Sequence, residues 1–224
     1  MSAPFPADPF GTPSSGGRGT SPETAKPWDR WLQILIILAV VTAIEFAVEL
    51  LDVVMDGRLD TYGIVPRTWS GLLGIIWAPF LHADFAHLIS NLVPGLVLGF
   101  FVLLSGRALV VTGVVWVVSG VGVWLTAPSM STTIGASGIV FGWLTFLIVR
   151  GLFSRDVWQV LGGVVIAVIY GGILWGVVPG ASGMSWQGHL FGAIGGVLAA
   201  WMTTTSADDK KVGDKNAIEL GGLS

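Results

Sequence analysis

Six long apolar runs constrain the fold of this chain more than any other feature of its sequence. Each has about 20 residues, the length that a helix needs to cross a hydrocarbon core of ~30 Å. Because 53% of the 224 residues are hydrophobic and only 11% are charged, a water-soluble fold is excluded. We predict an all-α polytopic membrane protein built as one bundle of six helices. The runs cover residues 31–51, 88–104, 108–125, 137–153, 157–178 and 186–203.

Two polar tails flank the predicted membrane domain, which covers residues 28–203. Residues 1–27 are rich in Pro, Gly, Ser and Thr and lack apolar periodicity, which predicts a disordered tail. Residues 204–224 are polar and predict a short solvated extension. The chain has no cysteine, so disulfides and thiolate chemistry are excluded. With a net charge of -3 and no basic patch in the apolar part, nucleic acid is not an expected partner.

The distribution of basic residues predicts the orientation in the membrane. Six spans place both termini on one side, and nine of the eleven Lys and Arg residues fall on that side. Only Arg58 and Arg67 fall on the other. The positive-inside rule therefore predicts a multi-pass protein of the cell membrane with both termini in the cytoplasm.

Two apolar segments are too short to span a membrane. Residues 69–81 should lie in the outer interface or enter it part-way. From Ser137 to the charged Arg150 the fourth helix rises only about 20 Å. If Arg150 marks the cytoplasmic face, Ser137 must lie below the outer surface, at the end of an irregular loop. Such backbone is tolerated in a membrane only where it is buried in protein or lines a watery cavity, so we predict that water enters there.

The residues that carry chemistry gather at the outer ends of three predicted helices. Ser137 lies in the segment GASG (135–138), where a helix cap or a helix-packing role is the alternative interpretation. His87 and Asn91 are spaced i, i+4 and therefore share one helix face. Small residues at 138 and 142 and at 188, 192 and 196 form two faces that allow close helix approach. Ser137 and His189 are direct neighbours of these glycines, so packing the two faces together would bring the hydroxyl and the imidazole close to each other.

This combination of side chains predicts acyl transfer. A serine hydroxyl becomes a nucleophile when an adjacent base takes its proton, and His189 is placed to do so. The free N–H groups at the start of the fourth helix, with Asn91 and His87, can bind the oxyanion. No carboxylate lies one turn from His189, which favours a Ser-His dyad whose imidazole is oriented by the ring of Phe141.

At these residues the chain resembles the rhomboid family of intramembrane serine proteases. The resemblance rests on HLISN (87–91), GASG (135–138) and GHLFG (188–192), in the family's order. It implies a six-span rhomboid-like bundle with a short, partly submerged fourth helix. It also implies the same roles for Ser137 as nucleophile and His189 as general base. The oxyanion site would comprise His87, Asn91 and the Ser137 N–H, with Gly135, Gly138, Phe141 and His82 in support.

The chain departs from the family's pattern at two places. Phe141 stands where the family often has Tyr, and YGIVPR (62–67) replaces a Trp-Arg pair that many relatives carry in the first external loop. His82 matches a histidine that the family often keeps near the site, and a structural hydrogen bond is its expected role. Glu45 and Glu49 are expected at a solvated or hydrogen-bonded edge, and Asp84 at an exposed site or a helix N-cap.

The resulting functional prediction is an intramembrane serine endopeptidase that needs no cofactor and opens to the non-cytoplasmic side. Its expected partners are the lipid bilayer and single-span transmembrane proteins, because a helical substrate must unwind before its carbonyl becomes accessible. One alternative is a catalytically silent rhomboid-like protein that binds transmembrane segments. Another is a small transporter or a zinc site built from His82, His87 and His189, which would leave Ser137 and Asn91 without a purpose.

Overall fold

The structure, a computed structural model, describes residues 27–180 and 184–221, and for residues 205–221 only the backbone. Within these residues there is no strand, only an isolated bridge between Ile64 and Thr133. Short 3-10 helices (η) interrupt or extend the α-helices. In chain order the elements are α1 (Pro27–Val54), η1 (Leu59–Tyr62), α2 (Trp69–Trp77), η2 (Ala78–Phe80), α3 (Phe85–Leu104), α4 (Ala108–Thr126), α5 (Ser137–Ser154), α6 (Val157–Tyr170), η3 (Gly171–Val177) and α7 (Trp186–Gly221).

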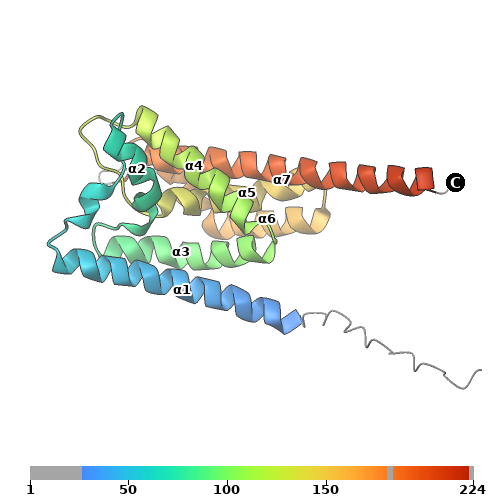
Figure 1. Cartoon of the computed structure of the whole chain (residues 1–224), viewed down its shortest axis with the longest axis horizontal. Coiled ribbons are helices and arrows are strands. Elements are labelled where there is room, and N and C mark those ends of the chain that lie inside the picture. The colour runs from blue at the N-terminus through green and yellow to red at the C-terminus, as the bar shows by residue number, and fades with distance from the viewer. Residues whose placement is uncertain (1–26, 181–183, 222–224) are drawn as a thin grey trace, which may run out of the picture.

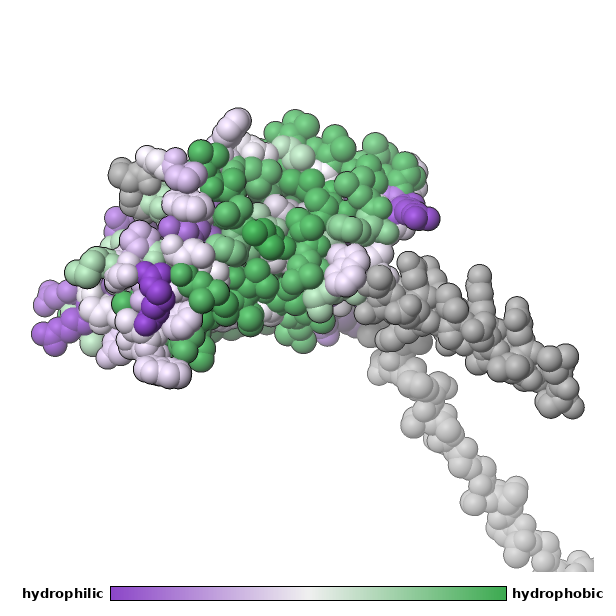
Figure 2. Space-filling view, turned by 90° about the horizontal axis from the view of Figure 1, so that it is seen from above, coloured by the Kyte–Doolittle hydropathy of each residue, from purple (hydrophilic) through white to green (hydrophobic). Residues whose placement is uncertain are grey.

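The prediction of an all-α polytopic membrane protein is confirmed. Five helices of the described part are long and apolar enough to cross a membrane: α1, α3, α4, α5, and α6 with η3. The sixth apolar run forms the first half of α7, which begins at Trp186 as predicted. The helix α2, which continues into η2, is apolar but too short to span a membrane, also as predicted. Figure 2 shows a broad hydrophobic surface across the middle of the bundle, with hydrophilic residues concentrated toward its ends.

Both ends of the membrane bundle lie on one side, as the six-span prediction requires. The start of α1 and the end of α7 point to the same end of the molecule (Figure 1). The guanidinium of Arg30 in α1 donates there to the carbonyl of Leu104, the last residue of α3. Residues 1–26 lie outside the described residues, and α7 continues into the segment assigned to the polar tail. Both tail assignments therefore stay predictions, as does the cytoplasmic location of this end.

The central element of the bundle is α5, which contacts α3, α4, α6 and, most extensively, α7. Over half of its span is buried inside the protein, the highest share among the candidate spans. It has 18 residues, compared with 28 in α1, and it begins at Ser137 as predicted. It ends at Ser154, and its C-cap Arg155 has a φ of 52°, which lies in the left-handed region. Asp156 then caps α6 by accepting from the N–H groups of Trp158 and Gln159.

The close contact between α5 and α7 depends on glycine, which confirms the predicted docking of small-residue faces. A Cβ atom added to Gly192 would lie 2.1 Å from the carbonyl oxygen of Gly138. One added to Gly196 would lie 2.1 Å from the carbonyl oxygen of Gly142. Because neither α7 position has room for a methyl group, the two backbones approach more closely than any larger residue would permit.

The first external loop is anchored to α4 and to the loop before α5. Ile64 and Thr133 exchange backbone hydrogen bonds, and the guanidinium of Arg67 donates to the Leu125 carbonyl at 2.9 Å. The indole N–H of Trp116 donates to the Ile75 carbonyl at 2.6 Å. Although the loop lacks the Trp-Arg pair of many relatives, these bonds hold α2 and η2 against the bundle.

Two expectations for acidic residues have different outcomes. Asp84 is an N-cap, as predicted, because its carboxylate accepts from the N–H of His87 at 2.7 Å. Glu45 and Glu49 are not at a solvated edge, since their exposures are only 7% and 2%. The expectation of a solvated edge was wrong because it considered α1 alone: Asp60 of η1 and Asp84 before α3 lie within electrostatic reach of Glu49.

Candidate active site

Ser137 and His189 meet across the contact between α5 and α7. Ser137 is the first residue of α5, and His189 lies in the first turn of α7. The serine Oγ and the imidazole Nε2 are 2.9 Å apart, which is hydrogen-bonding distance. His189 is buried and Ser137 is half-buried. The arrangement fulfils the geometric requirement of a nucleophile with an adjacent base.

The imidazole of His189 is held on two further sides. Its ring stacks on Phe141 with the centroids 4.0 Å apart and an interplanar angle of 3°. Its Nδ1 lies 2.9 Å from the carbonyl oxygen of Gly176 in η3. Because a carbonyl can only accept, Nδ1 carries the proton in the neutral ring and Nε2 is free to accept from Ser137. The Gly176 carbonyl thus selects the tautomer that a general base needs.

Sequence reasoning missed Gly176 because a backbone carbonyl has no side-chain signature. The position nevertheless requires glycine, since an added Cβ would lie 2.8 Å from Phe141 and 2.9 Å from Nδ1 of His189. The signal available in the sequence was the glycine run at 171, 172 and 176 near the end of the fifth apolar run. These glycines indicate that another segment packs closely against the backbone there, but they do not indicate that this segment carries His189.

A second group of polar side chains faces the loop just before Ser137. Gly135 has a φ of +107°, and an added Cβ there would lie 2.8 Å from Nε2 of His87 and 3.7 Å from Nδ2 of Asn91. The backbone N–H of Ala83 donates to Nδ1 of His87, so the neutral ring carries its proton on Nε2, toward Gly135. Asn91 is buried and donates one N–H to the His87 carbonyl at 2.9 Å. Its remaining N–H and Nε2–H of His87 are donors beside the N-terminus of α5.

His82 lies behind this group and does not form the expected structural hydrogen bond. Its ring is 1% exposed and contacts the ring of His87 edge-on, with centroids 5.1 Å apart. Among the described residues neither ring nitrogen has a hydrogen-bond partner. Burial, with a smaller contribution from the charge of His87, lowers the pKa of His82 to about 4. A weaker polar interaction with the Phe80 backbone raises the pKa and so opposes this shift. His82 is therefore a neutral packing residue at neutral pH.

The low pKa of His82 predicts that acid destabilises the protein. The unfolded chain binds a proton near pH 6.5, whereas the folded chain binds it near pH 4. Stability is therefore fully present above pH 6.5 and is lost as the pH falls to 4, by up to about 3 kcal/mol. Thermal unfolding in detergent between pH 4 and 7 measures this loss.

His82→Leu provides the reference for that measurement. Burial and the charge of Asp52 raise the pKa of Asp60 to about 6, so Asp60 opposes His82 over part of the same range. Asp60 affects the stability of the wild type and of His82→Leu equally, so its contribution cancels when the stability of one is subtracted from that of the other at each pH. If the stability difference between the wild type and His82→Leu did not change between pH 4 and 7, the buried neutral state of His82 would be contradicted.

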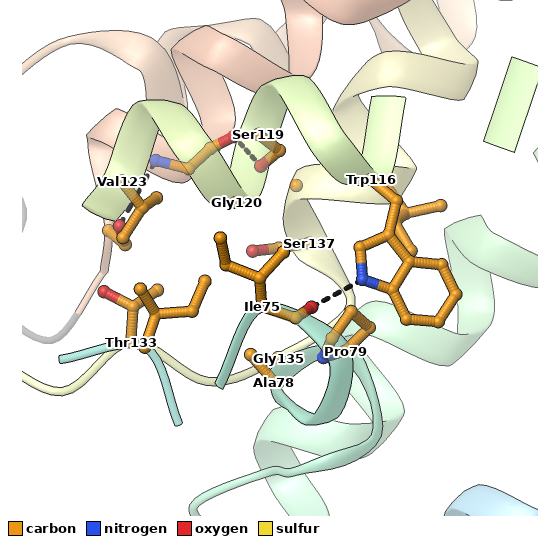
Figure 3. Close-up of a pocket in the computed structure, with 15 residues that line it drawn as sticks. Ile75, Ala78, Pro79, Trp116, Ser119, Gly120, Val123, Thr133, Gly135 and Ser137 are labelled. Atoms are coloured by element: carbon orange, nitrogen blue, oxygen red, sulfur yellow. Dashed lines mark hydrogen bonds between the residues drawn. The ribbon is translucent and has the colours of Figure 1, made fainter. Parts of the chain in front are cut away.

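A small cavity adjoins the serine. Its volume is about 30 Å³, enough for one or two water molecules. Figure 3 shows Ser137 facing this space, with Trp116 and Ser119 of α4 above it and Pro79 and Gly135 below. The Ser119 hydroxyl donates to the Gly188 carbonyl at 2.9 Å, which ties α4 to the residue before His189.

The site does not have the geometry of the alternative zinc site. In the described part of the chain no three His, Asp or Glu side chains are arranged to hold a metal ion. His82 and His87 contact each other, whereas His189 is engaged by Ser137, Phe141 and the Gly176 carbonyl.

Comparison with known proteins assigns the family. A family profile described as the Rhomboid domain matches residues 69–206, more than half of the chain. The chain belongs to the rhomboid family. It is 43% identical over 202 residues to the uncharacterized protein Rv1337 of Mycobacterium tuberculosis, a match that covers 86% of this chain and 82% of the relative. It is 42% identical over 192 residues to the uncharacterized protein ML1171 of Mycobacterium leprae, covering 81% and 75%.

A more distant rhomboid relative carries an enzyme name. The Rhomboid-like protease 5 of Toxoplasma gondii is 28% identical over 158 residues, covering 67% of this chain and 18% of that protein. No solved structure matches the chain. The match extends from the start of α2 into α7 and includes every site residue described above.

The stacked ring of Phe141, where rhomboids often have Tyr, allows a test of imidazole orientation. For a dyad that cleaves peptides, Phe141→Leu is expected to reduce the cleavage rate about tenfold, because the imidazole loses its flat support and samples other orientations. Phe141→Tyr, which keeps the ring, is expected to retain the rate. Initial rates on a transmembrane reporter measure both variants. Equal rates for Phe141→Leu and the wild type would show that the stack does not orient His189.

Proposed function

We propose that this rhomboid is an intramembrane serine endopeptidase that hydrolyses peptide bonds in or near transmembrane segments. The observation that carries the proposal is the 2.9 Å contact between Ser137 Oγ and His189 Nε2, with Nδ1 held against the Gly176 carbonyl. A packing serine needs no imidazole, and a buried histidine of structural role needs no accessible hydroxyl. Together they support a Ser-His dyad.

The proposed reaction proceeds in two steps. Ser137 Oγ attacks the scissile carbonyl carbon while Nε2 of His189 takes the hydroxyl proton. The oxyanion is stabilised by the Ser137 N–H at the start of α5 and by the free donors of His87 and Asn91. His189 then gives its proton to the leaving amine, and an ester to Ser137 remains. A water molecule that enters the cavity beside Ser119 loses a proton to His189 and attacks the ester. His189 then returns this proton to Ser137 Oγ as the C–O bond breaks, and the acyl group leaves as a carboxylic acid.

The proposed substrates are single-span membrane proteins. A peptide bond within a regular helix has its carbonyl hydrogen-bonded, so a segment with helix-breaking residues near the outer end of its span reaches the dyad most readily. The membrane domain supports a location in the cell membrane. From the distribution of Lys and Arg we propose cytoplasmic termini and a site open to the opposite side.

Covalent labelling tests the proposed nucleophile directly. A fluorophosphonate probe is expected to label the purified chain, and Ser137→Ala is expected to abolish the label. Ser154→Ala, at the other end of α5, is the matched control and should label like the wild type. Failure of the wild type to label would favour the catalytically silent, segment-binding alternative.

A further inference from the structure

A large cavity outside the catalytic dyad separates α1 and α3 from α4 and α5. Its volume is about 490 Å³, and mostly apolar side chains from all four helices line it, with Thr42, Glu45, Asn91 and Thr112 as polar exceptions. It extends from Asn91, near the oxyanion donors, to Leu103 and Ala108 at the other end of α3 and the start of α4. Along α3 this distance is about 18 Å, slightly more than the ~15 Å of hydrocarbon in one leaflet.

The cavity opens toward the surface that faces lipid. Among its lining residues, Ile37 and Val41 of α1 and Leu109 of α4 are exposed, at 45%, 40% and 92%. In a membrane these side chains are in contact with hydrocarbon, and the space behind them is open to it. Gly113 also lines the space, and an added Cβ there would meet nothing within 4 Å.

The size of the cavity favours a single acyl chain over a protein helix. The cavity extends about 18 Å along α3, little more than half of the ~30 Å that a transmembrane helix must cross, so it cannot enclose a whole span. A flexible hydrocarbon chain, in contrast, fits its length and its mostly apolar lining.

Two arginines mark the end of the cavity that lies near Leu103 and Ala108. Arg107 directly precedes the lining residues Ala108 and Leu109 and is the N-cap of α4. Arg30 reaches from α1 to the carbonyl of Leu104, beside the lining residue Leu103. Both arginine residues thus lie at this end of the cavity, beside the N-terminal N–H groups of α4, and both kinds of group favour an anion. Basic pockets between membrane helices bind anionic lipid headgroups for this reason.

We infer that this cavity binds an anionic membrane glycerophospholipid, with one acyl chain between the helices and the phosphate at Arg30 and Arg107. The bound chain fills space that separates α1 from α4 and extends to Asn91. The site is therefore a lipid-binding site continuous with the oxyanion group, and it is independent of whether Ser137 cleaves peptides.

The test uses the purified full-length chain equilibrated in detergent with equal amounts of phosphatidylglycerol and phosphatidylcholine. Native mass spectrometry then measures the two lipids bound. The two arginines near the headgroup together contribute about 2 kcal/mol, so phosphatidylglycerol is expected to exceed phosphatidylcholine about thirtyfold. The double variant Arg30→Gln, Arg107→Gln should bind both lipids equally. Arg58→Gln, which removes a charge outside this cluster, should keep the preference.

Variants that fill the cavity test the position of the acyl chain. Gly113→Leu is expected to reduce binding of both lipids at least fivefold, whereas Gly162→Leu on α6 should not. An added Cβ is equally unobstructed at both glycines, and only Gly113 lines the cavity. Val41→Trp at the exposed opening is a second filling variant, and thermal melting verifies folding. Equal binding of the two lipids by the wild type, or unchanged binding in both filling variants, would overturn the inference.

Discussion

Replacing Ser137 with alanine is expected to reduce cleavage of a transmembrane reporter by at least about 10⁴-fold, to the background rate. In the proposed mechanism the nucleophile is the hydroxyl at the start of α5, which lies 2.9 Å from Nε2 of His189. Loss of a nucleophile typically removes nearly all of the acceleration that such a site provides. Reporter segments in detergent or vesicles, analysed for product over time, measure the loss.

The two members of the dyad should act as one unit. His189→Ala and the double variant with Ser137→Ala are expected to be as inactive as Ser137→Ala alone, since removing either partner stops the same step. Ser154→Ala, on the same helix, should cleave at the wild-type rate. If His189→Ala lost only a few-fold in rate, or if the double variant were much slower than either single variant, the dyad mechanism would be contradicted.

The prediction of the fold from sequence succeeded where the local pattern of residues along one segment was enough. Helix starts at Ser137, Val157 and Trp186 could be predicted because each follows a turn or charged segment and begins a long apolar run. The start of α3 was predicted three residues late, at 88 instead of Phe85, although its N-cap Asp84 was identified. The side-by-side placement of α5 and α7 followed from glycine spacing, which states directly how closely two helix backbones approach.

What sequence reasoning missed depends on contacts between distant segments. The Gly176 carbonyl that binds His189 belongs to the backbone, so no residue type marks it. Glu49 is buried, and Asp60 of η1 and Asp84 before α3 lie within electrostatic reach of it, which the composition of α1 alone does not reveal. The cavity between α1 and α4 is also a property of four helices together. Such features arise from tertiary packing and cannot be obtained from the pattern of one segment.

The distance between Ser137 and His189 is fixed by the glycine contact beneath them. Both side chains project from helices whose backbones touch at Gly138 and Gly192, one residue from the serine and three from the histidine. A methyl group at 192 would lie 2.1 Å from the Gly138 carbonyl oxygen, whereas real contacts of this kind are almost never under 3.0 Å. The helices would have to separate by about 1 Å, a misplacement that can reduce catalysis by about 100-fold.

Gly192→Ala is accordingly expected to lower the cleavage rate about 100-fold and the free energy of unfolding by about 1–3 kcal/mol, the usual cost of overpacking. Gly162→Ala is the matched control, since it adds the same methyl group to a membrane helix where nothing lies within 4 Å. Reporter cleavage and thermal melting in the same detergent measure the two effects together. Because the substitution leaves both reacting side chains in place, a loss of rate in folded protein isolates their separation as the cause. Wild-type rate and melting temperature in Gly192→Ala would show that something other than this contact positions the serine against the imidazole.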